Sequence, residues 1–85
     1  MVDRFLLETY VPQVQAAEAR EAGERARAAA EALADEGTRI RYVRTTFLPE
    51  DETCFHLFEA QSAEAVRELG RRAGIEPIRV VGAVE

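Results

Sequence analysis

The 85-residue sequence contains one cysteine, one histidine, one methionine and no tryptophan. A single cysteine excludes a disulfide within the chain and fits a reducing compartment. A single histidine argues against a Ser-His-Asp hydrolytic site, and no glycine-rich phosphate loop or paired-cysteine motif is present. No run approaches 18 apolar residues, and no basic segment precedes an apolar run near the first residues. We therefore expect a cytoplasmic protein with no membrane partner.

Positive charge is also scarce, because 11 Lys and Arg residues face 16 Asp and Glu residues, giving a net charge of −5. Phosphate backbones and anionic membranes are bound by concentrated positive charge, so we expect no nucleic-acid partner. With 47% hydrophobic and 32% charged residues, the chain has the composition of one globular domain over residues 1–85. Many of the hydrophobic residues are alanines, which bury little area, and oligomerisation commonly stabilises so thin a core.

The hydrophobic pattern predicts six elements in the chain. Strands are predicted where apolar and polar residues alternate, and helices where apolar residues recur every three or four positions. The order is a strand at 4–10, a helix from about 13 to 36, strands at 38–48 and 53–60, a helix from 63 to 73 and a strand at 78–84. Ser62 is the expected N-cap of the second helix, and Gly37 and Gly74 are expected to end the two helices. Gly23 lies off the apolar stripe of the first helix and predicts a kink or a boundary there.

This order predicts an α+β, ferredoxin-like sandwich, in which two helices cover one face of a four-stranded antiparallel sheet. The first and third strands would be central neighbours, which brings the Glu8 region beside the His56 region. We expect the helix-free face to carry Leu6, Tyr10 and Phe58 and to be covered by a second copy of the chain, giving a homodimer.

The register between the second and third strands stays open at this point. Pairing Leu48 with Thr53 across a four-residue turn would place Thr45 opposite His56, whereas other turn lengths would place Thr46 or Arg44 there.

The candidate site lies in the 53–60 strand, which holds the only cysteine and the only histidine. Side chains alternate faces along a strand, so Cys54, His56 and Phe58 share one side. A thiol and an imidazole two residues apart lie about 7 Å from each other along the strand, which is close enough for both to bind one metal ion. The alternative is a buried cysteine acting as a small hydrophobic residue beside a structural histidine.

Five segments carry a family resemblance, namely 4–8, 41–45, 55–60, 64–67 and 71–75. They resemble a family of small bacterial ferredoxin-like proteins of unknown function that includes an actinobacterial nickel-binding protein. The resemblance implies a homodimer and transition-metal binding. Glu8 matches the family's glutamate in the first strand and would join Cys54 and His56 as a metal ligand, a set suited to nickel or zinc. The family often has a histidine at Arg44, and an arginine cannot ligate a metal because it stays protonated.

Two other functions stay open alongside metal binding. Related dimeric sandwiches host isomerases, cyclases and cofactor-free oxygenases that act on a small-molecule ligand. In such an enzyme His56 or Glu8 would transfer the proton and Arg44 would hold an anion, although Glu8 and Arg44 could equally form an ion pair. The remaining alternative is a structural or regulatory oligomer without a ligand of its own.

Overall fold

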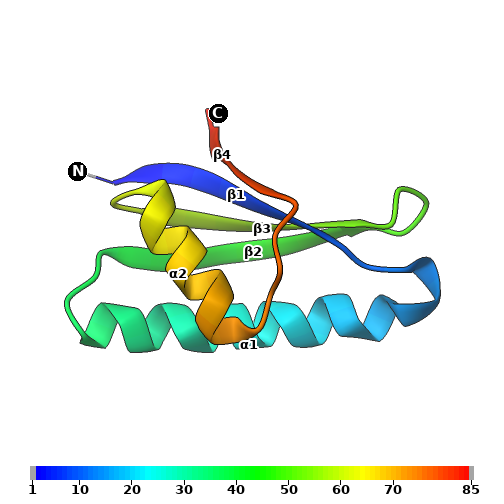
Figure 1. The fold of residues 1–85 in the computed structure, drawn as a ribbon, viewed down its shortest axis with the longest axis horizontal. Helices are drawn as coiled ribbons and strands as arrows, with labels where there is room; N and C mark the ends of the chain where they lie inside the picture. Colours follow the sequence, from blue (N-terminus) through cyan, green and yellow to red (C-terminus); the bar gives the residue numbers. More distant parts are fainter. Residues whose placement is uncertain (1, 85) are drawn as a thin grey trace.

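The structure is a computed structural model that describes residues 2–84. Its elements are β1 (Asp3–Tyr10), the 3₁₀ turn η1 (Gln13–Gln15), α1 (Ala16–Asp35), β2 (Ile40–Leu48), β3 (Thr53–Ala60), α2 (Ala63–Ala73) and β4 (Arg79–Ala83). The strands form one antiparallel sheet in the order β2-β3-β1-β4. In Figure 1 the long α1 runs beside the sheet and the shorter α2 is inclined against it. This arrangement confirms the predicted ferredoxin-like α+β fold.

The ends of both helices follow from single residues. The Ser62 hydroxyl accepts a hydrogen bond of 3.1 Å from the backbone N–H of Ala65 at the start of α2. Gly37 and Gly74 adopt φ angles of 100° and 68° after α1 and at the end of α2, which a residue with a Cβ rarely adopts. These three predicted signals are confirmed. No helix within residues 2–84 combines the length and the apolarity needed to cross a membrane.

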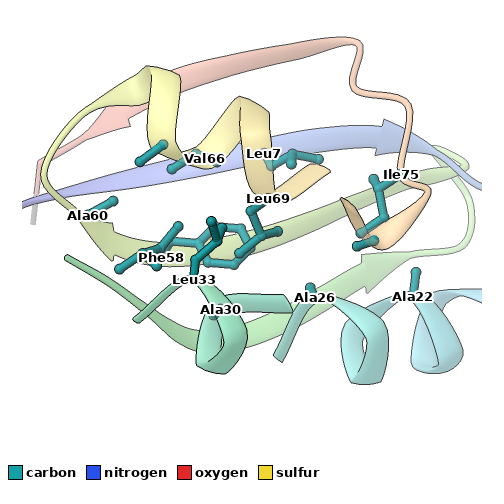
Figure 2. Packing of buried hydrophobic residues seen from close by; sticks show 13 residues of the cluster. Leu7, Ala22, Ala26, Ala30, Leu33, Phe58, Ala60, Val66, Leu69 and Ile75 are labelled. Atoms are coloured by element: carbon teal, nitrogen blue, oxygen red, sulfur yellow. The ribbon is translucent and has the colours of Figure 1, made fainter. Parts of the chain in front are cut away.

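The main core lies between the sheet and the two helices. Its largest fully buried apolar side chains are Phe58 of β3, Leu7 of β1, and Val66 and Leu69 of α2. In Figure 2 these side chains lie close together, above Ala22, Ala26 and Ala30 of α1. Alanines let the helix backbone lie close to the sheet, so most of the buried volume comes from β1, β3 and α2.

Phe58 corrects the expectation for the helix-free face. Phe58 is fully buried in the core and pairs with Phe5 of β1, whereas Leu6 pairs with Leu57 on the other side of the sheet. The antiparallel pairing joins odd-numbered residues of β1 to even-numbered residues of β3. Leu6 and Tyr10 therefore lie on the helix-free face without Phe58.

A β-bulge in β2 changes the predicted alternation of its side chains. Tyr42 pairs with Phe58, but the next pair joins Arg44 to Leu57, and Thr45 then pairs with His56. The extra residue, Val43, puts Tyr42 and Thr45 on the helix-covered face although they are three positions apart. The register itself follows the four-residue turn, since Leu48 pairs with Thr53.

Candidate functional site

Cys54 and His56 lie on the helix-covered face of β3, and neither residue has any exposed surface. Alternation along the strand points both side chains into the layer between β3 and α1. The Cys54 Sγ atom lies 3.7 Å from Nε2 of His56. The thiol packs in a small second cluster with Val11, Ala19 and Phe47, apart from the main core.

The other nitrogen of the His56 ring is held by β2. His56 Nδ1 lies 2.7 Å from Oγ1 of Thr45, and that hydroxyl lies 2.6 Å from the hydroxyl of Tyr42. The bulge in β2 makes this chain possible because it brings Tyr42 and Thr45 to the same face. Four polar side chains thus form one continuous row from Cys54 to Tyr42.

Gly23 of α1 packs directly on this row. A Cβ atom on Gly23 would stand 2.7 Å from the Thr45 hydroxyl oxygen and 3.3 Å from that of Tyr42. The glycine lies within a continuous helix from Ala16 to Asp35, so the predicted boundary at this position is wrong. Gly23 is instead a point where the helix backbone lies close against the sheet.

Burial controls the charge states of the pair. The pKa of His56 falls from its ordinary 6.5 to about 4, chiefly because burial disfavours the imidazolium and secondly because of the positive charge of Arg25. Burial raises the pKa of the Cys54 thiol from 9.0 to about 11. At neutral pH the pair is therefore a thiol and a neutral imidazole. One of them donates a hydrogen bond to the other, depending on the tautomer of the ring.

Glu8, the third predicted ligand, lies on the opposite face of the sheet. Its partner in β3 is Phe55, whereas His56 pairs with Leu7, and its carboxylate accepts a hydrogen bond of 2.7 Å from Arg79 Nε. The expectation that Glu8 joins Cys54 and His56 at one site is therefore wrong. Adjacent residues of β1 point to opposite faces, and the pairing places Leu7, not Glu8, beside the histidine.

The alternative proton-transfer site meets the same obstacle. Arg44 is exposed and pairs with Leu57, a residue of the helix-free face, while His56 faces the helices. His56, Glu8 and Arg44 therefore do not line a common cleft. The ion pair that the structure shows for Glu8 is with Arg79 at 2.7 Å.

The pair of donors has the chemistry of part of a metal site. A thiolate and an imidazole bound to one tetrahedral metal ion stand about 3.5 Å apart, given metal–sulfur and metal–nitrogen bonds of about 2.3 and 2.0 Å. The observed 3.7 Å between Sγ and Nε2 is close to that value. The Thr45 hydroxyl fixes the ring from its other nitrogen, as an outer partner of a ligating histidine does. No group of three His, Cys, Asp or Glu side chains among residues 2–84 lies close enough to bind one ion.

Sequence reasoning missed Tyr42, Thr45 and Gly23 as parts of the site. The signal for Thr45 was present, because the shortest turn places it opposite His56. Tyr42 gave no such signal, since regular alternation puts residues 42 and 45 on opposite faces, and only the bulge unites them.

Three comparisons place the chain among known proteins. No curated protein gives a significant match. A crystal structure of SCO4226 from Streptomyces coelicolor A3(2) superposes with a TM-score of 0.74 at 17% identity, covering 96% of each chain. At that identity the likeness shows the fold. The profile of the nickel responsive protein SCO4226-like family matches residues 5–82. The chain therefore belongs to the nickel responsive SCO4226-like family of proteins.

Proposed function

We propose that the protein binds nickel through the Cys54 thiolate and the His56 imidazole. The observation that supports this proposal best is the 3.7 Å separation of Sγ and Nε2, in a chain whose family is named for its response to nickel. Sulfur and imidazole nitrogen are ligands that nickel and zinc accept more readily than magnesium or calcium does. Because the described chain offers two donors at this point, the remaining coordination positions would be filled by water or another small ligand.

The two perturbed pKa values act in opposite directions on such binding. A His56 pKa of about 4 leaves the ring neutral at pH 7, and in the tautomer that carries its proton on Nδ1 the Nε2 atom is free to bind a metal. A Cys54 pKa of about 11 means that the metal must displace the thiol proton. Affinity should therefore rise with pH through the neutral range.

A cavity lies close to the Cys54 side of the pair. Ala19 and Phe47 pack on Cys54 and also line a cavity of about 410 Å³ between α1 and β2. Only one layer of side chains separates the cavity from the thiol. A displacement of the first turns of α1, which carry alanines at positions 16, 17 and 19, would open it.

Nickel titration of untagged, metal-free protein tests the proposal. We expect one equivalent of nickel per chain and a sulfur-to-nickel charge-transfer band in the near ultraviolet. Cys54→Ala should lose the band, and His56→Asn should weaken uptake at least tenfold. Glu8→Gln is the matched control, because Glu8 lies on the other face and should leave both readouts unchanged. The proposal would be overturned if the wild type took up neither nickel nor zinc above neutral pH. It would also be overturned if Cys54→Ala bound nickel with the same affinity and the same charge-transfer band as the wild type.

We also propose that the protein forms a homodimer through the helix-free face of the sheet. Half-buried Leu6, Phe55 and Val81 lie on this face around the buried Leu57, and no helix within residues 2–84 covers them. Tyr10 and Leu48 add exposed apolar surface, being 58% and 40% exposed. An apolar face of this kind is commonly covered by a second subunit.

Charges at the margins of this face suit a second copy of the same chain. Arg4 and Arg41 both contact Glu59, at 3.1 and 2.9 Å, and Arg79 contacts Glu8 at 2.7 Å. A face that carries both signs in close pairs does not repel its own copy. The proposed nickel ligands point away from this face, so dimerisation and metal uptake can be measured separately.

The oligomeric mass at micromolar concentration, measured by light scattering, tests the dimer. We expect twice the chain mass of 9.5 kDa. Leu6→Glu should shift the mass to that of a monomer, whereas Val14→Glu, at a site 92% exposed in η1, should not. A stable wild-type monomer would remove the proposal.

A further inference from the structure

The cavity between α1 and β2 has two different walls. Its volume is about 410 Å³, within the range of small-molecule sites. The helix contributes the small residues Ala16 and Gly23, and the strand contributes Tyr42, Thr45 and Phe47. The two walls meet at Gly23, and the aromatic rings of Phe47 and Tyr42 suit a ligand that carries a ring of its own.

The polar groups on the strand wall are held in position before any ligand arrives. The Tyr42 ring packs edge-on against the buried Phe58 ring, with centroids 5.9 Å apart and an interplanar angle of 67°. Its hydroxyl lies 2.6 Å from the Thr45 hydroxyl, which in turn contacts His56. When His56 Nδ1–H donates to Thr45 and Thr45 donates to Tyr42, the Tyr42 hydroxyl proton is available to a ligand. When Tyr42 donates to Thr45 and Thr45 donates to His56, the Tyr42 oxygen can accept a hydrogen bond from a ligand.

The helix side of the cavity also carries a cation. Arg20 is exposed and forms no ion pair with any residue of the described chain. The other arginines of α1 differ, because Arg25 contacts Glu18 at 2.9 Å and Arg27 contacts Glu24 at 2.7 Å. Glu24, the acidic residue lining the cavity, is thus already paired with Arg27. A guanidinium without an acidic partner beside an apolar cavity is suited to bind a carboxylate.

We propose that this cavity binds a small aromatic carboxylate. The ring lies against Phe47 and Ala16, the carboxylate contacts Arg20, and a hydroxyl or carbonyl at the other end of the ligand contacts Tyr42. The proposal does not rest on nickel, because none of these contacts uses Cys54 or His56.

Binding of 4-hydroxybenzoate to the metal-free protein tests the proposal. We expect saturable binding by calorimetry and NMR shifts confined to the cavity residues. Arg20→Gln and Tyr42→Phe should each weaken binding, the first at least tenfold, and Ala16→Phe should abolish it by filling the cavity from an exposed position. Arg67→Gln, an exposed arginine of α2, is the matched control and should bind as the wild type does. No saturable binding, or equal binding to Arg20→Gln, overturns the proposal.

A neutral analogue isolates the role of charge. 4-Hydroxybenzyl alcohol keeps the ring and the phenol but lacks the carboxylate, so its affinity should be at least tenfold lower. Equal affinity would contradict the assignment of Arg20. Nickel titration of Arg20→Gln, which we expect to match the wild type, keeps the outcome separate from the proposed metal function.

Discussion

The buried face of β3 has two halves that differ in chemistry although they are equally inaccessible. Phe58 and Ala60 lie in a hydrocarbon core beneath α2 and α1, whereas Cys54 and His56 lie under the first half of α1 among small residues. All four side chains have 0% exposure. The first half is held by packed volume and the second by hydrogen bonds, so the two halves should respond to different perturbations.

The polar half is complete in its hydrogen bonding. No buried side-chain nitrogen or oxygen atom of residues 2–84 lacks a partner. His56 reaches this state through Thr45 on one side and Cys54 on the other. Satisfying a buried imidazole required a bulge in β2 and a glycine in α1, whereas the apolar half needed neither. A buried imidazole needs partners of this kind because an unpaired buried polar group would be costly.

The largest effect is expected in the apolar half. Leu69→Ala removes most of a fully buried side chain and should reduce the free energy of unfolding by about 2 to 4 kcal/mol. Its neighbour Glu68 is partly exposed and paired with Arg71 and Arg72, so Glu68→Ala should reduce stability far less than Leu69→Ala does. Urea denaturation of both variants measures the difference. Equal losses in the free energy of unfolding would contradict the burial of Leu69 between α2 and the sheet.

The polar half should dominate the pH dependence of stability just below neutrality. His56 has a pKa of about 4 in the folded chain and an ordinary value of 6.5 when unfolded, so between these values the unfolded chain binds the additional proton. Stability is thus full above pH 6.5 and is lost as the pH falls toward 4, by about 2 kcal/mol between pH 7 and pH 5.

Denaturation series at several pH values measure how the free energy of unfolding changes between pH 7 and pH 5. His56→Asn should remove most of this pH dependence. The acidic side chains with lowered pKa, such as Glu59 and Glu68, titrate mainly below this window. An unchanged slope in the variant would show that His56 is not the group responsible.

Gly23→Ala probes the contact between α1 and the polar row. Alanine favours a helix by about 1 kcal/mol over glycine, but its Cβ would stand 2.7 Å from the Thr45 hydroxyl oxygen. We expect a net loss of about 1 to 2 kcal/mol in thermal or urea unfolding, reduced when Thr45→Ala is present as well. Gly82→Ala, where a Cβ would meet nothing within 4 Å, is the control. A more stable Gly23→Ala protein would contradict the close approach.

The smallest effect compares the beginnings of the two helices. Ser62→Ala removes the hydroxyl that caps α2 and should cost about 1 kcal/mol. Gln15 stands at the same position in α1 but its side chain makes no cap hydrogen bond, so Gln15→Ala should change stability by less than half as much. Melting temperatures of the two variants test this order, and its reversal would show that local capping matters more to α1 than to α2.

Much of the fold followed from local chemistry. Hydrophobic periodicity together with Gly37, Ser62 and Gly74 located the elements, and β3 begins and ends where the pattern predicted, at Thr53 and Ala60. In α2 the apolar residues Val66, Leu69 and Ala73 recur at three- and four-residue steps, and all three are buried. These features are local, so one segment of sequence contains the information for each.

The site could be predicted only in part. Alternation showed that Cys54 and His56 share a face, but not which face the helices cover, because both sides of β3 carry apolar and polar residues. Whether Glu8 lies beside His56 depends on the register of β1 against β3. This register is a tertiary property that neither strand's sequence contains alone. No glycine or proline near Val43 indicates the bulge in the sequence. The bulge nevertheless determines which face of the sheet Tyr42 lies on.

The short turn η1, which leads into α1, is tied to a distant hairpin. The carbonyl oxygen and the carboxylate of Glu52, in the turn between β2 and β3, accept hydrogen bonds of 2.9 and 2.8 Å from the backbone N–H groups of Val11 and Gln13. A local N-cap can form as soon as its own segment is synthesised. The hydrogen bond between Gln13 and Glu52, in contrast, joins residues that are 39 positions apart in the sequence. We therefore expect η1 to become ordered only when the β2–β3 hairpin has formed.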